Sequence, residues 1–180
     1  MVSRSRPTSG PGSLWDGEFA RYFGERAHQL RATAFLLCGD WHRAEDLTQT
    51  ALVKLYVAWP RLSRHDSLDA YARKVVLRTF LAENRRSRWK RERLTDVPPD
   101  VPAASPTSDD LVVQRALAVL GPRQRAVLVL RYFEDLSVEE TAAALGCSTG
   151  TVKSQAARGL ATLRAKLGPH FAAMPITGGR

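Results

Sequence analysis

The sequence predicts an all-α protein with two small helical domains joined by a flexible linker. Apolar residues recur at spacings of three and four through most of the chain, the period of an amphipathic helix. No segment alternates with period two for long enough to form a strand. Near the middle, residues 94–108 lose the periodicity and hold several prolines, which is typical of a semi-extended linker. These three observations predict the fold class and the position of the division.

The first half of the chain contains three helical patterns. The first has six apolar residues on one face and ends at Gly39: Phe19, Phe23, Ala27, Leu30, Ala34 and Leu37. The second starts at Ala44, with Leu47, Ala51, Leu55 and Trp59 inward, and Pro60 is expected to end it. A polar loop from Arg61 then leads to a third helix over about 68–86, with Tyr71, Val75, Val76, Phe80 and Leu81 as its apolar set.

The second half has its own helix signals. Gly121 is expected to end one helix, and Pro122 suits the first position of the next. The nearly continuous apolar run 126–133 should be buried. The predicted domain boundaries are a disordered tail over 1–13, an N-terminal domain over 14–93, the linker over 94–108, a C-terminal domain over 109–168 and a tail over 169–180.

Residues 137–167 predict two helices that meet at a sharp turn. Ser137 and Glu140 have the spacing of a capping box, and Gly146 supplies the turn because glycine reaches positive φ without a penalty. In the second helix an apolar stripe points inward: Val152, Ala156, Leu160, Leu163 and Leu167. Small, polar and basic groups point outward, as reading the major groove of DNA requires. An ordinary αα-hairpin with a solvated face is the alternative.

The charge balance favours a polyanionic partner. The chain has a formal net charge of +9 and a pI near 10.2, so nucleic acid is the simplest partner and an anionic membrane surface a weaker one. The run 85–93 (RRSRWKRER) is the densest basic part, and Trp89 within it favours phosphate contact and base stacking over a merely solvated face. Trp59 and Tyr71 fit core packing better than stacking.

Other classes of protein are not indicated. Cys38 and Cys147 are too few and too far apart for a disulfide scaffold or a metal site. The N-terminus has no apolar segment typical of a secretory signal, and no run is long enough to span a membrane. We therefore expect a cytoplasmic protein.

Two stretches resemble a known family. Residues 44–56 (AEDLTQTALVKLY) resemble region 2.2 of bacterial sigma factors, and residues 120–137 (LGPRQRAVLVLRYFEDLS) with 150–155 (GTVKSQ) resemble region 4. The order and the linker match the small two-domain extracytoplasmic-function (ECF) group of the sigma-70 superfamily, and the resemblance is to its actinobacterial SigE-like members. The high content of Ala, Arg and Leu fits a GC-rich actinobacterial genome. The resemblance covers roughly residues 18–168.

The resemblance implies a dissociable specificity subunit of RNA polymerase. The first domain would hold the clamp helices of the largest polymerase subunit and melt promoter DNA near −10, and the second would read the −35 duplex. An anti-sigma factor is left open as a further partner. The implied protein is not an enzyme and has no catalytic residues, metal, cofactor, small-molecule substrate or membrane partner.

The family's functional positions map onto three groups of residues. The implied core-polymerase contacts are Asp46, Gln49 and Thr50. The implied −10 DNA contacts are Arg61, Arg64, His65, Arg78, Arg85, Arg86, Arg88 and Trp89. The implied −35 contacts are Thr149, Thr151, Lys153, Ser154, Gln155 and Arg158. Three of these depart from the common pattern, because Thr50 replaces Glu, Arg78 replaces Asn and Gln155 replaces Arg.

Two other functions are alternatives to the sigma factor. A ligand-responsive helix-turn-helix regulator with a helical sensor lobe would need a dimerisation helix and a ligand pocket, and the sequence shows neither signature. A hydrolase or transferase could use His42, Glu45 and Asp46, but His42 is expected before the helix and no second ligand pair or nucleophile motif accompanies it.

Overall fold

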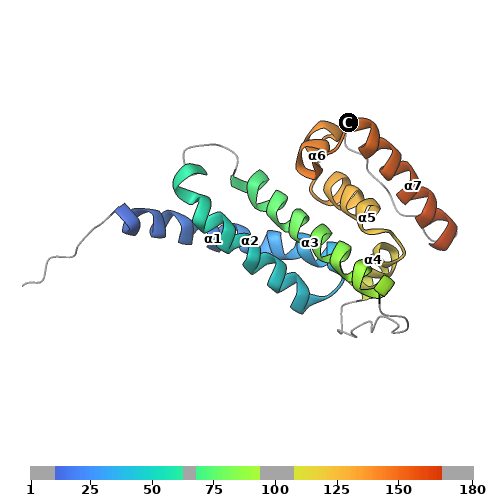
Figure 1. Ribbon diagram of the computed structural model, residues 1–180, viewed down its shortest axis with the longest axis horizontal. Coiled ribbons are helices and arrows are strands. Elements are labelled where there is room, and N and C mark those ends of the chain that lie inside the picture. Colours follow the sequence, from blue (N-terminus) through green and yellow to red (C-terminus); the bar gives the residue numbers. More distant parts are fainter. Residues whose placement is uncertain (1–10, 63–67, 94–107, 168–180) are drawn as a thin grey trace, which may run out of the picture.

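The computed structural model describes residues 11–62, 68–93 and 108–167, and nearly all of them are helical (Figure 1). None of the described residues forms a strand, so the all-α prediction is confirmed. The N-terminal lobe contains α1 (Pro11–Cys38), α2 (Trp41–Leu62) and α3 (Leu68–Arg93). The C-terminal lobe contains α4 (Ser108–Ala118), α5 (Pro122–Leu128), the π-helical turn η1 (Val129–Phe133), α6 (Val138–Leu145) and α7 (Thr149–Leu167).

The N-terminal lobe is a three-helix bundle whose core follows the predicted stripes. Leu47, Ala51, Leu55 and Trp59 of α2 are buried, and so are Val75, Val76 and Phe80 of α3. On α1 the prediction holds for Leu30, Ala34 and Leu37. It is wrong for Phe23, whose side chain is 47% exposed. Tyr22, next to it in the sequence, is buried in its place, and its ring packs against Trp59 with the ring planes at 58°.

The start of α2 differs from the prediction because of a cap that precedes it. Gly39 has φ of +75° and ends α1, as expected. The Asp40 carboxylate then accepts a hydrogen bond of 2.7 Å from the Arg43 amide, which is an N-cap contact. The helix therefore begins at Trp41 rather than Ala44, and His42 lies in its first turn rather than before it.

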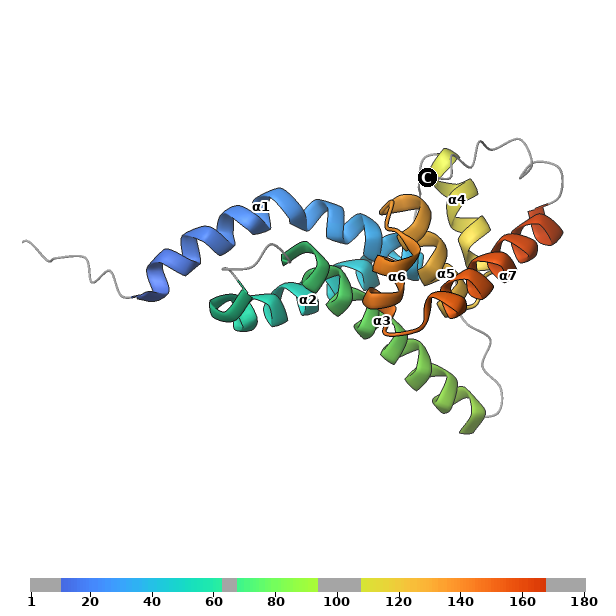
Figure 2. The same cartoon turned by 90° about the horizontal axis from the view of Figure 1, so that it is seen from above.

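Two helices are longer than predicted. Pro60 does not end α2, which continues through Arg61 to Leu62. Proline lacks the amide that would bond to the carbonyl of Tyr56, but only the last turn is affected, and Trp59 stays 3% exposed in the core. Helix α3 continues past the predicted end at residue 86 to Arg93, so the basic run 85–93 is helical. Figure 2 shows the C-terminal half of α3 projecting beyond the rest of the bundle.

The C-terminal lobe is built around the second half of α5, where Ala126, Val127 and Leu128 are buried. Val127 packs with Ala142 and Val152, and Leu128 packs with residues of α4 and α7. Helix α4 ends at Ala118, earlier than predicted, while Gly121 caps α5 and Pro122 begins it. Gly159 of α7 approaches Leu128 so closely that an added Cβ would lie 3.1 Å from its Cδ1.

The prediction that the whole run 126–133 is buried is wrong at its end. Residues 126–130 are buried, whereas Tyr132 is 42% and Phe133 is 49% exposed. The reason is the wide π turn, in which the Glu134 amide bonds to the Val129 carbonyl at 3.1 Å. The extra residue in this turn changes the direction of the side chains, so the two aromatic rings face outward.

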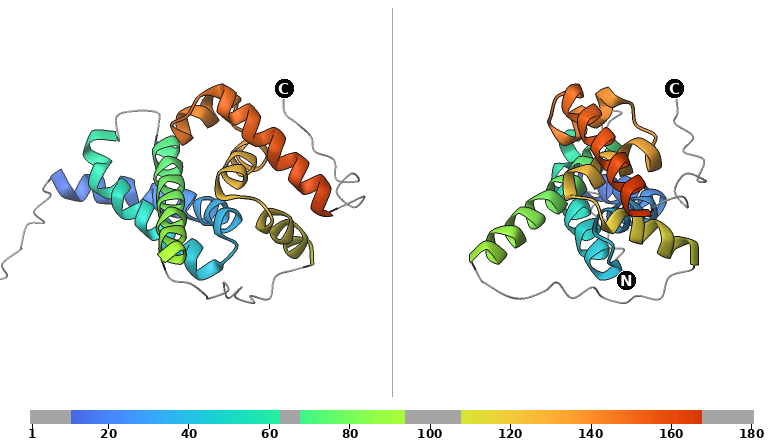
Figure 3. Two further views of the ribbon diagram at one scale, coloured as in Figure 1. Left: turned by 45° about the vertical axis from the view of Figure 1, so that its right-hand side comes forward. Right: turned by 90° about the vertical axis from the view of Figure 1, so that its right-hand side faces the viewer.

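The two lobes pack against each other and share one apolar core. Ala126, Val129 and Leu130 of the C-terminal lobe belong to the same buried cluster as Leu37 and Phe80 of the N-terminal lobe. Figures 1 and 2 show the C-terminal lobe, yellow to red, beside the end of the bundle opposite Pro11. In Figure 3, α7 lies on the outer side of this lobe.

Candidate nucleic-acid interface

Helices α6 and α7 form the predicted helix-turn-helix. The Ser137 amide donates to Glu140 Oε2 at 2.8 Å, and the Glu140 amide donates to Ser137 Oγ at 3.1 Å, so the capping box is present. The first of these contacts lowers the pKa of the Glu140 carboxyl. This cap therefore stabilises the helix above the ordinary glutamate pKa and is lost as the pH falls through the lowered value. Gly146 has φ of 64° and makes the sharp turn, as predicted.

A second local contact fixes the start of α7. The Ser148 hydroxyl accepts a hydrogen bond of 3.2 Å from the Thr151 amide and lies 2.9 Å from the Thr151 hydroxyl. Behind this turn, buried Val152 packs on Val127 and Ala142, which fixes α7 relative to α6. Such a supported helix presents one face to solvent with little freedom to reorient.

The exposed face of α7 carries most of the predicted −35 residues. Thr149, Lys153, Ser154 and Arg158 are exposed. Thr151 and Gln155 are half-buried at the edge of this face, and Thr151 is held by Ser148. A small, polar and basic helix face of this kind can enter the major groove and contact base edges and phosphates.

A groove of about 590 Å³ lies between α2 and α3. Its lining includes residues from two of the predicted groups, the polymerase contacts and the −10 DNA contacts. It is lined by Thr50, Lys54, Tyr71, Val75, Arg78, Thr79, Ala82, Glu83 and Arg86. Lys54, Arg78 and Arg86 are basic, while Glu83, the acidic residue among the nine, is paired with Arg43 at 3.2 Å. Tyr71 and Val75 add apolar surface. Cations beside an aromatic ring are the groups that binding of a single-stranded nucleic acid requires.

The predicted −10 residues do not form a single cluster. Arg78 and Arg86 meet in the groove, whereas Arg61 is exposed in the last turn of α2. Arg85 and Trp89 are exposed on the projecting part of α3, where Trp89 is 63% accessible. Arg64 and His65 lie outside the described residues, as does the Arg88 side chain. Lys54 was missed, although its place one turn after Thr50 on α2 was a usable signal.

The predicted polymerase contacts occupy the outer face of α2. Asp46 and Gln49 are exposed, and Thr50 is half-buried at the edge of the groove. The same face continues into apolar residues that the sequence analysis missed: Val53, Tyr56 and Val57 are 64%, 48% and 75% exposed. Their spacing from Gln49 by four, seven and eight residues was the signal, because these positions share one helix face.

Other kinds of site find no support in the described part of the chain. No group of three His, Cys, Asp or Glu side chains within it could hold a metal ion. None of its helices is both long and apolar enough to cross a membrane. Cys38 and Cys147 are free and half-buried, as expected for small apolar core residues.

Two family profiles match the chain, one in each lobe. The profile described as "Sigma-70 region 2" matches residues 23–90, and the one described as "Sigma-70, region 4" matches residues 110–163. RNA polymerase sigma-E factor of Streptomyces coelicolor is 42% identical, over 83% of this chain and 86% of its own length. The chain belongs to the ECF group of the sigma-70 family.

Other relatives agree with this membership. The ECF sigma factor SigE of Mycolicibacterium smegmatis is 33% identical over 87% of this chain and 62% of its own length. Among solved structures, the sigma factor RpoE of Bartonella quintana, in complex with the anti-sigma factor NepR, is 26% identical. It covers 83% of this chain and 96% of its own, with a TM-score of 0.72. Sigma factors are transcription initiation factors without enzymatic activity, so the hydrolase alternative is excluded.

Proposed function

We propose that this sigma factor divides promoter recognition between its lobes. The N-terminal lobe binds the clamp helices of the largest polymerase subunit through α2 and holds the melted −10 strand along α3, and α7 reads the −35 duplex. The observation that supports this most is that polar and basic surfaces lie on both lobes, a helix-turn-helix face on one and a basic groove on the other. The first suits duplex DNA and the second suits unpaired DNA.

The proposal extends to where the protein works and to a further partner. Its relatives are named as RNA polymerase sigma factors, which supports action in the cytoplasm, where polymerase and promoters are. The Bartonella quintana sigma factor was solved with an anti-sigma factor, which supports a partner of that kind here.

Reversing one charge on α2 should weaken polymerase binding. Asp46 is exposed and lies on the same face as Gln49, so Asp46→Arg should raise the Kd for core RNA polymerase by more than about tenfold, through repulsion and lost contacts. Helical content and Tm should stay nearly unchanged. Competition for core polymerase against a labelled wild-type protein measures the effect. Glu25→Arg, an equal charge change at an exposed position of α1, is the control. Equal competition by Asp46→Arg and wild type would refute the assignment.

Gln155 should contribute to the choice of one −35 base pair. It lies half-buried at the edge of the exposed face of α7, so only a long side chain can reach a base. Glutamine can contact adenine N6 and N7 together, whereas arginine favours guanine O6 and N7. Gln155→Arg should shift the preference at one position by about 1–3 kcal/mol. Selection of −35 sequences with both proteins measures this, and identical preferences at every position would remove Gln155 from base readout.

A further inference from the structure

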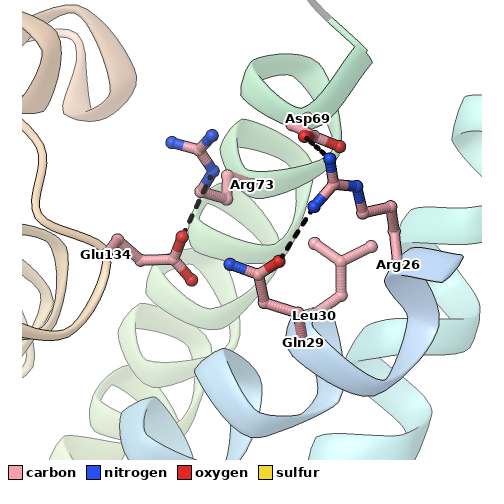
Figure 4. Close-up of a pocket in the computed structure, with 6 residues that line it drawn as sticks. All are labelled: Arg26, Gln29, Leu30, Asp69, Arg73 and Glu134. Carbon is pink, nitrogen blue, oxygen red and sulfur yellow. Dashed lines mark hydrogen bonds and ion pairs between the residues drawn. The ribbon is translucent and has the colours of Figure 1, made fainter.

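Three cations in the groove between α2 and α3 have no carboxylate partner. Four other arginines of the N-terminal lobe are each paired with a carboxylate at 3.2–3.5 Å: Arg26, Arg31, Arg43 and Arg73. Figure 4 shows two of these pairs, Arg26–Asp69 and Arg73–Glu134. By contrast, Lys54, Arg78 and Arg86 line the groove and form no such pair within the described residues. The groove therefore keeps three positive charges available for an anionic ligand.

The rest of the lining suits a base and a sugar. Tyr71 is half-buried and lies with Val75 and Ala82 along the α3 side of the groove, which gives this side an apolar surface. An aromatic ring of this kind stacks on a base of any sequence. The Thr79 hydroxyl already donates to the Val75 carbonyl at 2.9 Å. The hydroxyls of Thr50 and Tyr71 bond to no other group of the described residues, so both can bond to a ligand.

The aromatic ring and the cations follow one another along the groove. Tyr71 and Arg78 are seven residues apart, so they share one face of α3 and lie about 10 Å apart along its axis. Arg86 continues this row toward the C-terminus of α3. Helices α2 and α3 run antiparallel (Figure 1), and the Arg43–Glu83 pair fixes their register. In this register Lys54 of α2 lies near the Tyr71 end of the groove. A base on the ring would thus have cations beside it and beyond it.

The groove has more cations than one nucleotide of a DNA strand requires. Its volume of about 590 Å³ is that of a site for a single small molecule, which is about 300–1,000 Å³. One nucleotide of a strand brings about one negative charge. A free nucleoside di- or triphosphate brings roughly three or four, because its terminal phosphate is almost doubly ionised at neutral pH. Three unpaired cations in this volume therefore match a polyphosphate better than a strand.

We propose that the groove binds a free nucleoside polyphosphate, with the base on Tyr71 and the phosphates among Lys54, Arg78 and Arg86, and that this ligand competes with the −10 strand. The competition rests on the proposed function, which places the strand in the same groove, whereas the nucleotide site does not. Both ligands need the same cations, so they exclude each other. A nucleotide at concentration [N] then weakens binding of the strand by the factor 1 + [N]/Kd.

A series of ligands with increasing charge tests the site. Isothermal titration calorimetry of the full chain would compare adenosine, AMP, ADP and ATP. Affinity should rise with each phosphate, and ATP should bind at least about tenfold more tightly than AMP, because each added charge meets an unpaired cation. The groove variant, Lys54→Gln with Arg78→Gln and Arg86→Gln, should lose at least about tenfold in affinity for ATP. Circular dichroism establishes that each variant folds.

A control variant separates the groove from the net charge of the chain. With a formal charge of +9, the protein attracts any polyanion to some extent. Replacing Arg21, Arg115 and Arg123 by glutamine removes the same charge from exposed positions outside the groove. This control should bind ATP as wild type does. Equal affinity of the groove variant and the control for ATP would overturn the nucleotide site.

Tyr71 distinguishes a nucleotide from phosphate alone. Tyr71→Leu removes the ring and should weaken ATP binding by about five- to tenfold while leaving binding of inorganic tripolyphosphate unchanged, because stacking on a ring adds about 1–3 kcal/mol per base. Tyr71→Phe keeps the ring and should retain at least half of the affinity for ATP. Equal losses for ATP and tripolyphosphate in Tyr71→Leu, or no loss for either, would overturn the assignment of the base to this ring.

Competition with promoter DNA gives the functional readout. ATP should raise the Kd of wild-type holoenzyme and of the control holoenzyme for forked DNA severalfold. The groove-variant holoenzyme should show a smaller effect, which measures the contribution of nucleotide bound by polymerase itself. Equal effects of ATP on all three holoenzymes, with DNA binding that depends on the groove cations, would overturn the competition.

Failure of the nucleotide site and failure of the proposed function give different results. ATP that does not bind the free protein overturns the site, whatever happens with forked DNA. If ATP binding depends on the groove cations while forked DNA binds the groove-variant and control holoenzymes equally, the −10 strand does not lie in the groove. That result would refute this part of the proposed function and would leave the nucleotide site in place.

Discussion

Replacement of Leu130 by alanine should lower the free energy of unfolding by about 2–5 kcal/mol, the range for large-to-small changes in a packed core. Leu130 has no exposed surface and belongs to the core cluster that both lobes share. Its loss removes apolar burial and leaves a cavity that helices from two lobes cannot close easily. Urea unfolding followed by circular dichroism, with wild type and variant under identical conditions, measures the difference.

A truncation at the surface is the control, because it removes a side chain without removing core packing. Val57 on α2 is 75% exposed, so Val57→Ala should change the free energy of unfolding by less than about 0.5 kcal/mol. A loss below about 1 kcal/mol for Leu130→Ala would mean that this residue is not packed between the lobes. Two separate unfolding transitions, with the change confined to one, would mean that the lobes unfold independently.

Neutralising the groove should weaken binding to melted promoter DNA without changing sequence preference. The triple variant Lys54→Gln, Arg78→Gln and Arg86→Gln removes the three cations that line the groove between α2 and α3. If each contacts one phosphate, the slope of log K against log salt should flatten by about 0.7 per contact for single-stranded DNA. The corresponding loss of affinity at about 0.15 M salt is roughly ten- to hundredfold. Holoenzyme binding to forked DNA, as a function of salt, measures both quantities.

A control variant with the same net charge as the groove variant tests whether the position of the cations matters. Arg21, Arg115 and Arg123 are exposed at other places, and replacing all three by glutamine should leave the salt slope for forked DNA nearly unchanged. The groove variant should lose affinity for cognate and for scrambled −10 strands by similar factors, because phosphates carry no sequence information. A salt slope equal to that of wild type would exclude the groove cations from phosphate contact.

Much of the helix-turn-helix could be predicted because its determinants are local. The capping box of Ser137 and Glu140 and the left-handed Gly146 depend on residues three or four positions apart, so their pattern is visible in the sequence. The exposed face of α7 follows from the same period. The need for glycine at position 159 was missed, because it comes from the close approach of Leu128 on another helix.

The predictions that were wrong concern features that depend on contacts between elements or on a change of helix period. Pro60 was expected to end α2, yet the helix continues to Leu62, and Trp59 before the proline stays buried. Tyr132 and Phe133 were expected in the core, but the π turn directs them to solvent. No local pattern marks Glu134 as a buried partner of Thr33 and Arg73, which lie far away in the sequence. The packing of one lobe on the other is a tertiary property, and only the structure reveals it.

Run-off transcription tests most directly whether this chain selects promoters as a sigma factor. Core RNA polymerase from Streptomyces coelicolor, whose sigma-E factor is 42% identical to this chain, would be combined with the purified protein and a library of random promoters. We expect transcripts that require the protein, arise from templates sharing a −35 and a −10 element at one spacing, and are lost with Asp46→Arg. Transcript levels equal to those of core polymerase alone on every template would contradict the claim that this chain selects promoters.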